Sequence, residues 1–137
     1  MSAPATDPLA GLDADQRRAA ETLLGPVCIL AGAGTGKTRA ITARIAHGVR
    51  EGVYTSGSLL ALTFTTKAAG ELRQRLRALD AGGAVVRTFH AEALAQVGHF
   101  WPDLVGGGAP KLLDNKARFI GEAGDAAHIK LGRTAIR

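Results

Sequence analysis

Residues 26–38 read Pro-Val-Cys-Ile-Leu-Ala-Gly-Ala-Gly-Thr-Gly-Lys-Thr, and the other predicted elements are arranged around them. Their first part, residues 27–30, is a continuous apolar run with a β-branched bias, which predicts a strand buried on both faces. The glycine-rich part leads into a helical pattern. A strand that turns through glycines into a helix directs backbone N–H groups at one point, where the helix dipole adds positive charge. The sequence here therefore predicts a phosphate-binding loop.

The loop departs from the usual pattern GxxxxGK[ST] at one position, because Ala31 stands where the first glycine belongs. Gly34 and Gly36 supply the positive-φ freedom that such a loop needs. Lys37 is expected to reach the β- and γ-phosphates and the Thr38 hydroxyl to ligate Mg²⁺. The alternative is a glycine-rich turn that precedes Lys-Thr by chance, and the predicted strand and helix on either side disfavour it. The loop consists of Ala31, Gly32, Ala33, Gly34, Thr35, Gly36, Lys37 and Thr38.

The composition is that of a folded, basic protein. The chain has 137 residues, is 46% hydrophobic and carries a formal net charge of +5. This charge favours polyanionic partners, and ordinary solubility is the less favoured alternative. The single cysteine, Cys28, excludes a disulfide or a cysteine zinc site within the chain and is expected to pack as a small hydrophobe. No signal-like leader or membrane-length apolar run is found, so a reducing, cytoplasmic location is the default expectation.

Apolar periodicity predicts alternating strands and helices. Asp13 and Gln16 have capping-box spacing at the start of the first helix, which Gly25-Pro26 ends. The alternation predicts an α/β fold with a parallel sheet, in which ligands bind beyond the carboxyl ends of the strands. Strands are expected at 27–30, 58–64 and 84–87, and helices at 13–24, 37–49, 68–79, 91–100 and 114–123. The expected domains are a disordered leader (1–11), a main domain (12–104), a linker (105–110) and a C-terminal helical part (111–137).

Aromatic and polar side chains follow the second and third predicted strands. Phe64 is followed by Thr-Thr-Lys, and Phe89 stands between Thr88 and His90. An aromatic ring beside hydroxyls and a lysine suits stacked bases with a charged backbone, whereas the alternative for each ring is core packing. The other histidines show no metal-ligand spacing, and each histidine alone is more often structural.

Gln16, the phosphate loop and two later segments occur in an order that resembles the amino-terminal portion of the UvrD/PcrA/Rep-like DNA helicases of superfamily 1. The segments are Thr-Phe-Thr-Thr-Lys-Ala-Ala at 63–69 and Arg-Thr-Phe-His at 87–90. The resemblance covers roughly residues 12–100 and continues more weakly over 112–123. It implies a RecA-like P-loop NTPase domain with an incomplete parallel sheet, followed by the start of an inserted helical subdomain.

The resemblance also implies roles for individual residues. Gln16 matches a glutamine that recognises adenine, Arg39 matches an arginine of the same base pocket, and the loop binds ATP with Mg²⁺ at Thr38. Thr66 stands where an asparagine is common, so amide-specific bonding is lost while a hydroxyl remains for phosphate contact. The residues that would contact single-stranded DNA are Phe64, Thr65, Thr66, Lys67, Thr88, Phe89 and His90.

The carboxylates that hydrolysis requires are the part of the family pattern that is missing. Family members use an adjacent Asp-Glu pair, and no Asp-Glu dipeptide occurs in this sequence. We therefore expect the first part of a longer 3′–5′ DNA helicase, beginning at Met1 and continuing past Arg137 into a second motor domain. Such a protein would be cytoplasmic and nucleoid-associated, and this part would bind nucleotide without unwinding DNA.

Two other functions remain open from the sequence. A P-loop nucleotide kinase would share the loop but would need an acceptor pocket and lid arginines, and it would leave the two later segments unexplained. A non-catalytic nucleic-acid-binding module would use the basic face of Arg73, Arg75 and Arg77, which is otherwise an ordinary solvated helix face.

Overall fold

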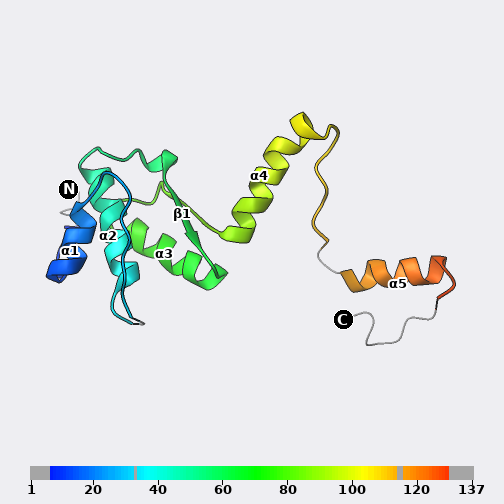
Figure 1. Cartoon of the computed structure of the whole chain (residues 1–137), viewed down its shortest axis with the longest axis horizontal. Helices are drawn as coiled ribbons and strands as arrows, with labels where there is room; N and C mark the ends of the chain where they lie inside the picture. Colours follow the sequence, from blue (N-terminus) through cyan, green and yellow to red (C-terminus); the bar gives the residue numbers. More distant parts are fainter. Residues whose placement is uncertain (1–6, 33, 114–115, 130–137) are drawn as a thin grey trace, which may run out of the picture. The chain divides into compact units, whose positions relative to one another are not determined.

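The computed structural model describes residues 7–32, 34–113 and 116–129. Their contacts form two compact units, residues 1–96 and 97–137, and the division falls within helix α4. The elements are α1 (Ala14–Glu21), α2 (Lys37–Arg50), a 3₁₀ turn η1 (Ser56–Ser58), β1 (Leu60–Thr63), α3 (Thr66–Ala78), β2 (Val85–Thr88), α4 (Phe89–Leu104) and α5 (Lys116–Ala126), as Figure 1 shows.

The two strands β1 and β2 form a small parallel sheet. Leu60 pairs with Val85 and Thr63 with Thr88, so both strands end at the same edge. Helix α3 connects them, and its buried Leu72 confirms the apolar stripe predicted for this helix. The predicted α/β class with parallel strands is therefore confirmed.

The core of the first unit lies between α2, α3 and the sheet. Most of its buried side chains are alanines, and Leu76, at 1% exposure, is the largest fully buried side chain of the described residues. Small side chains let the elements approach closely but bury little apolar area each. The cluster consists of Ala46, Ala61, Ala69, Leu72, Leu76, Ala81, Ala84 and Val86.

The prediction of a buried strand at residues 27–30 is wrong for this structure. The segment is assigned to no strand, Leu30 is 92% exposed and Cys28 is exposed instead of packing as a core hydrophobe. An apolar run is buried in a sheet only where neighbouring strands pair with it and helices cover it. Residues 27–30 pair with neither β1 nor β2, so the apolar side chains keep their contact with solvent.

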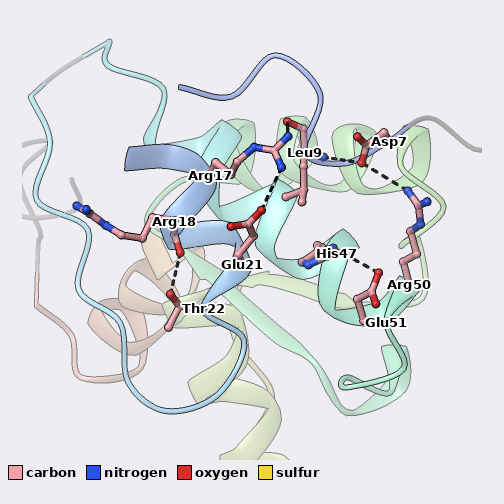
Figure 2. A network of polar contacts seen from close by, with 9 residues as sticks. All are labelled: Asp7, Leu9, Arg17, Arg18, Glu21, Thr22, His47, Arg50 and Glu51. Carbon is pink, nitrogen blue, oxygen red and sulfur yellow. Dashed lines mark hydrogen bonds and ion pairs between the residues drawn. The ribbon is translucent and has the colours of Figure 1, made fainter. Parts of the chain in front are cut away.

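The predicted disorder does not extend over residues 7–11. Ala10 N donates to Asp7 O at 3.1 Å, and Leu9 is only 7% exposed because it packs against Ala20 and Ala43. Figure 2 shows this segment beside α1 and α2, where Arg50 reaches Asp7 at 3.5 Å. One well-placed leucine thus orders a stretch whose composition is typical of a loop. The remainder of the predicted leader, residues 1–6, lies outside the described residues.

The helix ends agree with the sequence at α1 and differ at α4. Gln16 N donates to the Asp13 carboxylate at 2.8 Å and Asp13 N to Gln16 Oε1 at 3.3 Å, which confirms the capping box. Helix α4 continues through Pro102, although proline has no N–H to donate to the Gly98 carbonyl; the turn that follows is closed by the bond from Val105 N to Trp101 O at 2.9 Å. The predicted cap at Asp114 lies outside the described residues. None of the helices in the described ranges is long and apolar enough to cross a bilayer.

Candidate functional site

The glycine-rich loop has the backbone conformations that its sequence predicts. Gly34 and Gly36 have φ of 77° and 86°, in the left-handed region that favours glycine. Gly36 is the N-cap of α2, and Thr35 Oγ1 donates to Gly32 O at 2.8 Å across the turn. The loop therefore leads directly into a helix N-terminus, as expected, although no strand precedes it.

The first turn of α2 has an unusual charge for a helix N-terminus. It contains Lys37 and Arg39 but no acidic residue, and the Gly36 cap offers no side-chain acceptor. Cations at the positive end of the helix dipole are unfavourable, whereas an anion there is stabilised. This helix end is therefore suited to a bound anion.

The Lys37 side chain folds back over the loop. Its ammonium donates to the carbonyl oxygens of Ala31, at 2.8 Å, and Gly32, at 2.5 Å. These bonds hold the positive charge of Lys37 against the backbone of the loop.

Gln16 connects helix α1 to the loop. Its Nε2 donates to Thr35 O at 3.1 Å while its Oε1 completes the capping box. A Cβ at Gly36 would lie 2.6 Å from Gln16 Nε2, so the contact depends on a glycine at the helix cap. The structural role of Gln16 in the capping box of α1 is thus observed, and its side chain also bonds to the loop backbone. The adenine contact stays a prediction.

Arg39 is held by the N-terminal segment. Its Nη2 donates to Ala10 O at 3.1 Å, and a Cβ at Gly11, where φ is 68°, would come within 2.6 Å of the same nitrogen. The sequence analysis missed this segment, for which the available signal was the isolated Leu9 before the N-cap of α1. Residues 7–12 therefore belong to the surroundings of the loop.

Figure 2 shows how the same segment is tied to α1 and α2. Arg17 donates to Leu9 O at 3.4 Å and pairs with Glu21 at 3.0 Å, so one guanidinium bridges the segment and α1. Further along α2, His47 lies 3.8 Å from Glu51. The Arg17 and Arg50 contacts hold the segment beside α1 and α2, whereas the His47–Glu51 pair lies at the end of α2.

Phe64 and Phe89 are brought together at the carboxyl ends of β1 and β2. Their ring centroids are 5.1 Å apart with an interplanar angle of 36°, and they are 86% and 46% exposed. Neither ring is a core residue, which disfavours the alternative of core packing. The pair forms an exposed aromatic surface at the edge where the parallel sheet ends.

The polar residues around this pair divide into two groups. Thr65 and Thr88 accept hydrogen bonds from Ala68 N and Ala91 N, at 3.1 and 3.2 Å, so their hydroxyls cap α3 and α4. Thr66, Lys67 and His90 are exposed and lie next to the rings in sequence, and within the described part of the chain their side chains make no hydrogen bond. Lys67 adds a positive charge to the first turn of α3, where no acidic residue stands.

A largely apolar cavity of about 250 Å³ lies where α2, β1 and α3 meet. Thr38 lines it from the first turn of α2, and Thr63 from the end of β1. The cavity adjoins the edge of β1 that does not pair with β2. Within the described ranges no group of three or more His, Cys, Asp or Glu side chains could hold a metal ion.

The structure is thus that of an α/β protein with a glycine-rich loop at a helix N-terminus and an exposed aromatic pair at the strand ends. The model of the family described as UvrD/REP helicase N-terminal domain matches residues 12–116. The chain belongs to this family, which agrees with the resemblance seen in the sequence and not with a nucleotide kinase.

Comparison with individual proteins also finds relatives that are named as DNA helicases. The ATP-dependent DNA helicase UvrD2 of Mycobacterium tuberculosis is 46% identical over 142 residues, covering 97% of this chain and 20% of UvrD2. Rep of Escherichia coli is 44% identical over 87 residues, covering 61% of this chain and 13% of Rep. PcrA of Bacillus subtilis is 42% identical over 86 residues, covering 61% of this chain and 12% of PcrA. The chain therefore spans a fifth or less of the length of these curated relatives.

Proposed function

We propose that this chain is the ATP-binding part of an ATP-dependent 3′–5′ DNA helicase. The observation that carries the proposal is the loop at residues 31–38, where Lys37 lies over a helix N-terminus that has no acidic residue. The converging positive potential supports binding of a triphosphate. The family match and the relatives' names, which describe ATP-dependent DNA helicases, support ATP as the nucleotide.

In this proposal Gln16 and Arg39 recognise the adenine base. Both lie next to the loop, but each now bonds to a backbone carbonyl, at Thr35 and Ala10. Gln16 Nε2 carries a second N–H that remains for a base nitrogen. Base binding would therefore use this second donor while the tie to the loop is kept.

The residues present fit Mg²⁺ bound together with the nucleotide. Magnesium is commonly held by one or two protein oxygens plus phosphate oxygens and water. The Thr38 hydroxyl is exposed in the first turn of α2 and can supply one ligand. When bound, the ion neutralises phosphate charge, while Lys37 and the N–H groups at the start of α2 orient the phosphates.

Hydrolysis requires groups that we propose come from the rest of a longer polypeptide. An acidic pair that holds Mg²⁺ and orients the attacking water is absent from the sequence, which has no Asp-Glu dipeptide. The chain alone would then bind ATP without turning it over. Movement on DNA requires a cleft that opens and closes between this part and a second motor domain. That second domain would also come from the remainder of the polypeptide.

The same remainder is proposed to complete a RecA-like sheet. Among the described residues one edge of β1 is unpaired, and the cavity of about 250 Å³ is lined by β1 and by no residue of β2. Within residues 27–30, Cys28 and Leu30 are exposed and Val27 and Ile29 half-buried, although the sequence is suited to a buried strand. A further strand would satisfy the free backbone groups of β1 and cover the exposed apolar side chains. The boundaries of the motor domain at 12–104, of the linker at 105–110 and of the helical subdomain from 111 are part of this proposal.

The nucleotide proposal is tested by titrating the chain with ATP in the presence and absence of Mg²⁺, with heat release as the readout. We expect saturable binding that Mg²⁺ strengthens, because the ion screens phosphate charge and links it to Thr38. ATP turnover should stay at the background rate. Absence of any saturable ATP binding would contradict the proposal, and sustained turnover would contradict the assignment of the catalytic acids to the remainder.

Phe64 and Phe89 are proposed to stack on bases of single-stranded DNA. Exposed aromatic rings beside a positive charge are the usual surface for single strands, since every base has a face on which a ring can stack. The two rings lie 5.1 Å apart and Lys67 is exposed on the adjoining turn of α3. The family match supports DNA as the polyanion that the net charge of +5 favours.

Replacing Phe64 by alanine is expected to weaken binding of a fluorescein-labelled oligothymidine about tenfold, the loss of one base–aromatic stack. Fluorescence anisotropy at fixed salt measures the affinity. Phe100→Ala is the matched control, because Phe100 is 51% exposed and lies outside the pair. Equal losses in both variants, or none in Phe64→Ala, would contradict the stacking role.

A further inference from the structure

Two side chains that the proposed function does not use converge on the turn before the phosphate loop. The Tyr54 hydroxyl donates to the carbonyl oxygen of Leu23. Arg44 Nη2 donates to Leu23 O at 3.5 Å and to Gly25 O at 3.2 Å, and Arg44 Nε donates to the Tyr54 hydroxyl at 3.3 Å. We call Tyr54 and Arg44 together the turn clamp.

Tyr54 is itself fixed against helix α2. Its backbone N–H donates to Gly48 O at 2.9 Å, and its ring lies directly over Gly48. A Cβ at Gly48 would clash with Cδ2 and Cε2 of the Tyr54 ring, so the ring can occupy this position only because residue 48 is glycine. Both members of the turn clamp are half-buried, which limits their freedom to leave these positions.

The turn clamp holds the start of the segment whose end is the first turn of α2. Residues 23–25 follow α1 and lead through residues 26–30 into the loop, and α2 begins at Lys37. Arg44 projects from α2, so the two ends of the loop segment are fixed to the same helix. Residues 26–30 form no ladder with β1 or β2, and so the pairing of strands does not fix the start of the loop in the described chain.

We propose that Tyr54 and Arg44 are positioning residues for the phosphate loop. Tyr54 and Arg44 hold the Leu23 and Gly25 carbonyls and so fix the start of the loop segment relative to α2. In that position the N–H groups of the loop and the Lys37 ammonium can bind the same phosphate. This positioning role rests on the proposed nucleotide function. It adds residues outside the loop that influence the affinity of the loop for ATP. Tyr54 lies far from the loop in sequence, but α2 connects them directly.

The test is Tyr54→Phe, which keeps the ring over Gly48 and removes only the hydroxyl. We expect ATP–Mg²⁺ affinity to fall about fivefold, the loss of one hydrogen bond's contribution. Hydrogen exchange of the amides of Gly32, Gly34 and Gly36 should accelerate, while that of the α3 amides stays unchanged. Arg44→Met is the second variant and should act in the same direction, so the test does not depend on one substitution that fails to fold.

Thr22→Val is the matched control. Figure 2 shows the Thr22 hydroxyl beside Arg18, to whose carbonyl oxygen it donates at 2.7 Å; among the contacts of the described residues it makes no hydrogen bond to the Leu23 or Gly25 carbonyls. This variant should keep the affinity and the loop exchange of the original chain. Tyr54→Phe with unchanged loop exchange, or with equal acceleration in α3, would overturn the positioning role. If the original chain fails to bind ATP, the proposed function fails, while the exchange measurement still decides the clamp.

Discussion

Lys37→Met is expected to weaken ATP–Mg²⁺ binding by about a hundredfold. A charge-assisted bond from an ammonium to phosphate is worth roughly 1.5–3 kcal/mol, and methionine keeps the length of the side chain without its charge. The ammonium bonds to the loop carbonyls of Ala31 and Gly32, and its third N–H remains available for a phosphate oxygen. Isothermal titration of the variant and of the original chain measures the change.

The fold should tolerate this substitution. Lys37 is a cation at the unfavourable end of the α2 dipole, and its removal offsets part of the two lost bonds to loop carbonyls. Lys67→Met is the matched control, because Lys67 occupies the first turn of α3 and is exposed. It should leave ATP binding unchanged and weaken oligothymidine binding. A Lys37→Met chain that is folded and binds ATP with the original affinity would contradict the phosphate role.

The parts of the fold that follow from local pattern were predictable. Leu72 and Leu76 mark one face of α3 by their spacing, and the glycines of the loop require positive φ wherever that loop is placed. The joining of Phe64 and Phe89 also follows, because parallel strands end at one edge. Their tilt and exposure do not follow, since a ring after a strand is equally compatible with core packing.

The errors of the sequence analysis concern contacts between distant residues. Residues 27–30 have the composition of a buried strand, but burial depends on neighbouring strands, and neither described strand pairs with them. Leu9 is buried against Ala20 and Ala43, and a single leucine before the N-cap of α1 does not indicate which distant residues it will contact. Tyr54 contacts Leu23 across α2, and a single tyrosine in a loop gives no signal of such a contact.

Leu76→Ala is expected to lower the free energy of unfolding of the first unit by about 3 kcal/mol. Replacing a buried leucine by alanine costs the transfer free energy of the lost atoms plus a term for the cavity left behind. Leu76 is 1% exposed in a cluster that otherwise consists mainly of alanines, so few large side chains can move into the space. Urea unfolding followed by circular dichroism measures the loss.

Leu104→Ala is the control for this change, because Leu104 is 80% exposed and loses the same atoms without leaving a cavity. Its effect should stay within about 0.5 kcal/mol. Domains of this size have only about 5–15 kcal/mol of stability in total, so Leu76→Ala should also shift the midpoint of thermal unfolding downward by several degrees. Equal losses in the two variants would show that the alanine-rich cluster around Leu76 does not form the core of the chain in solution.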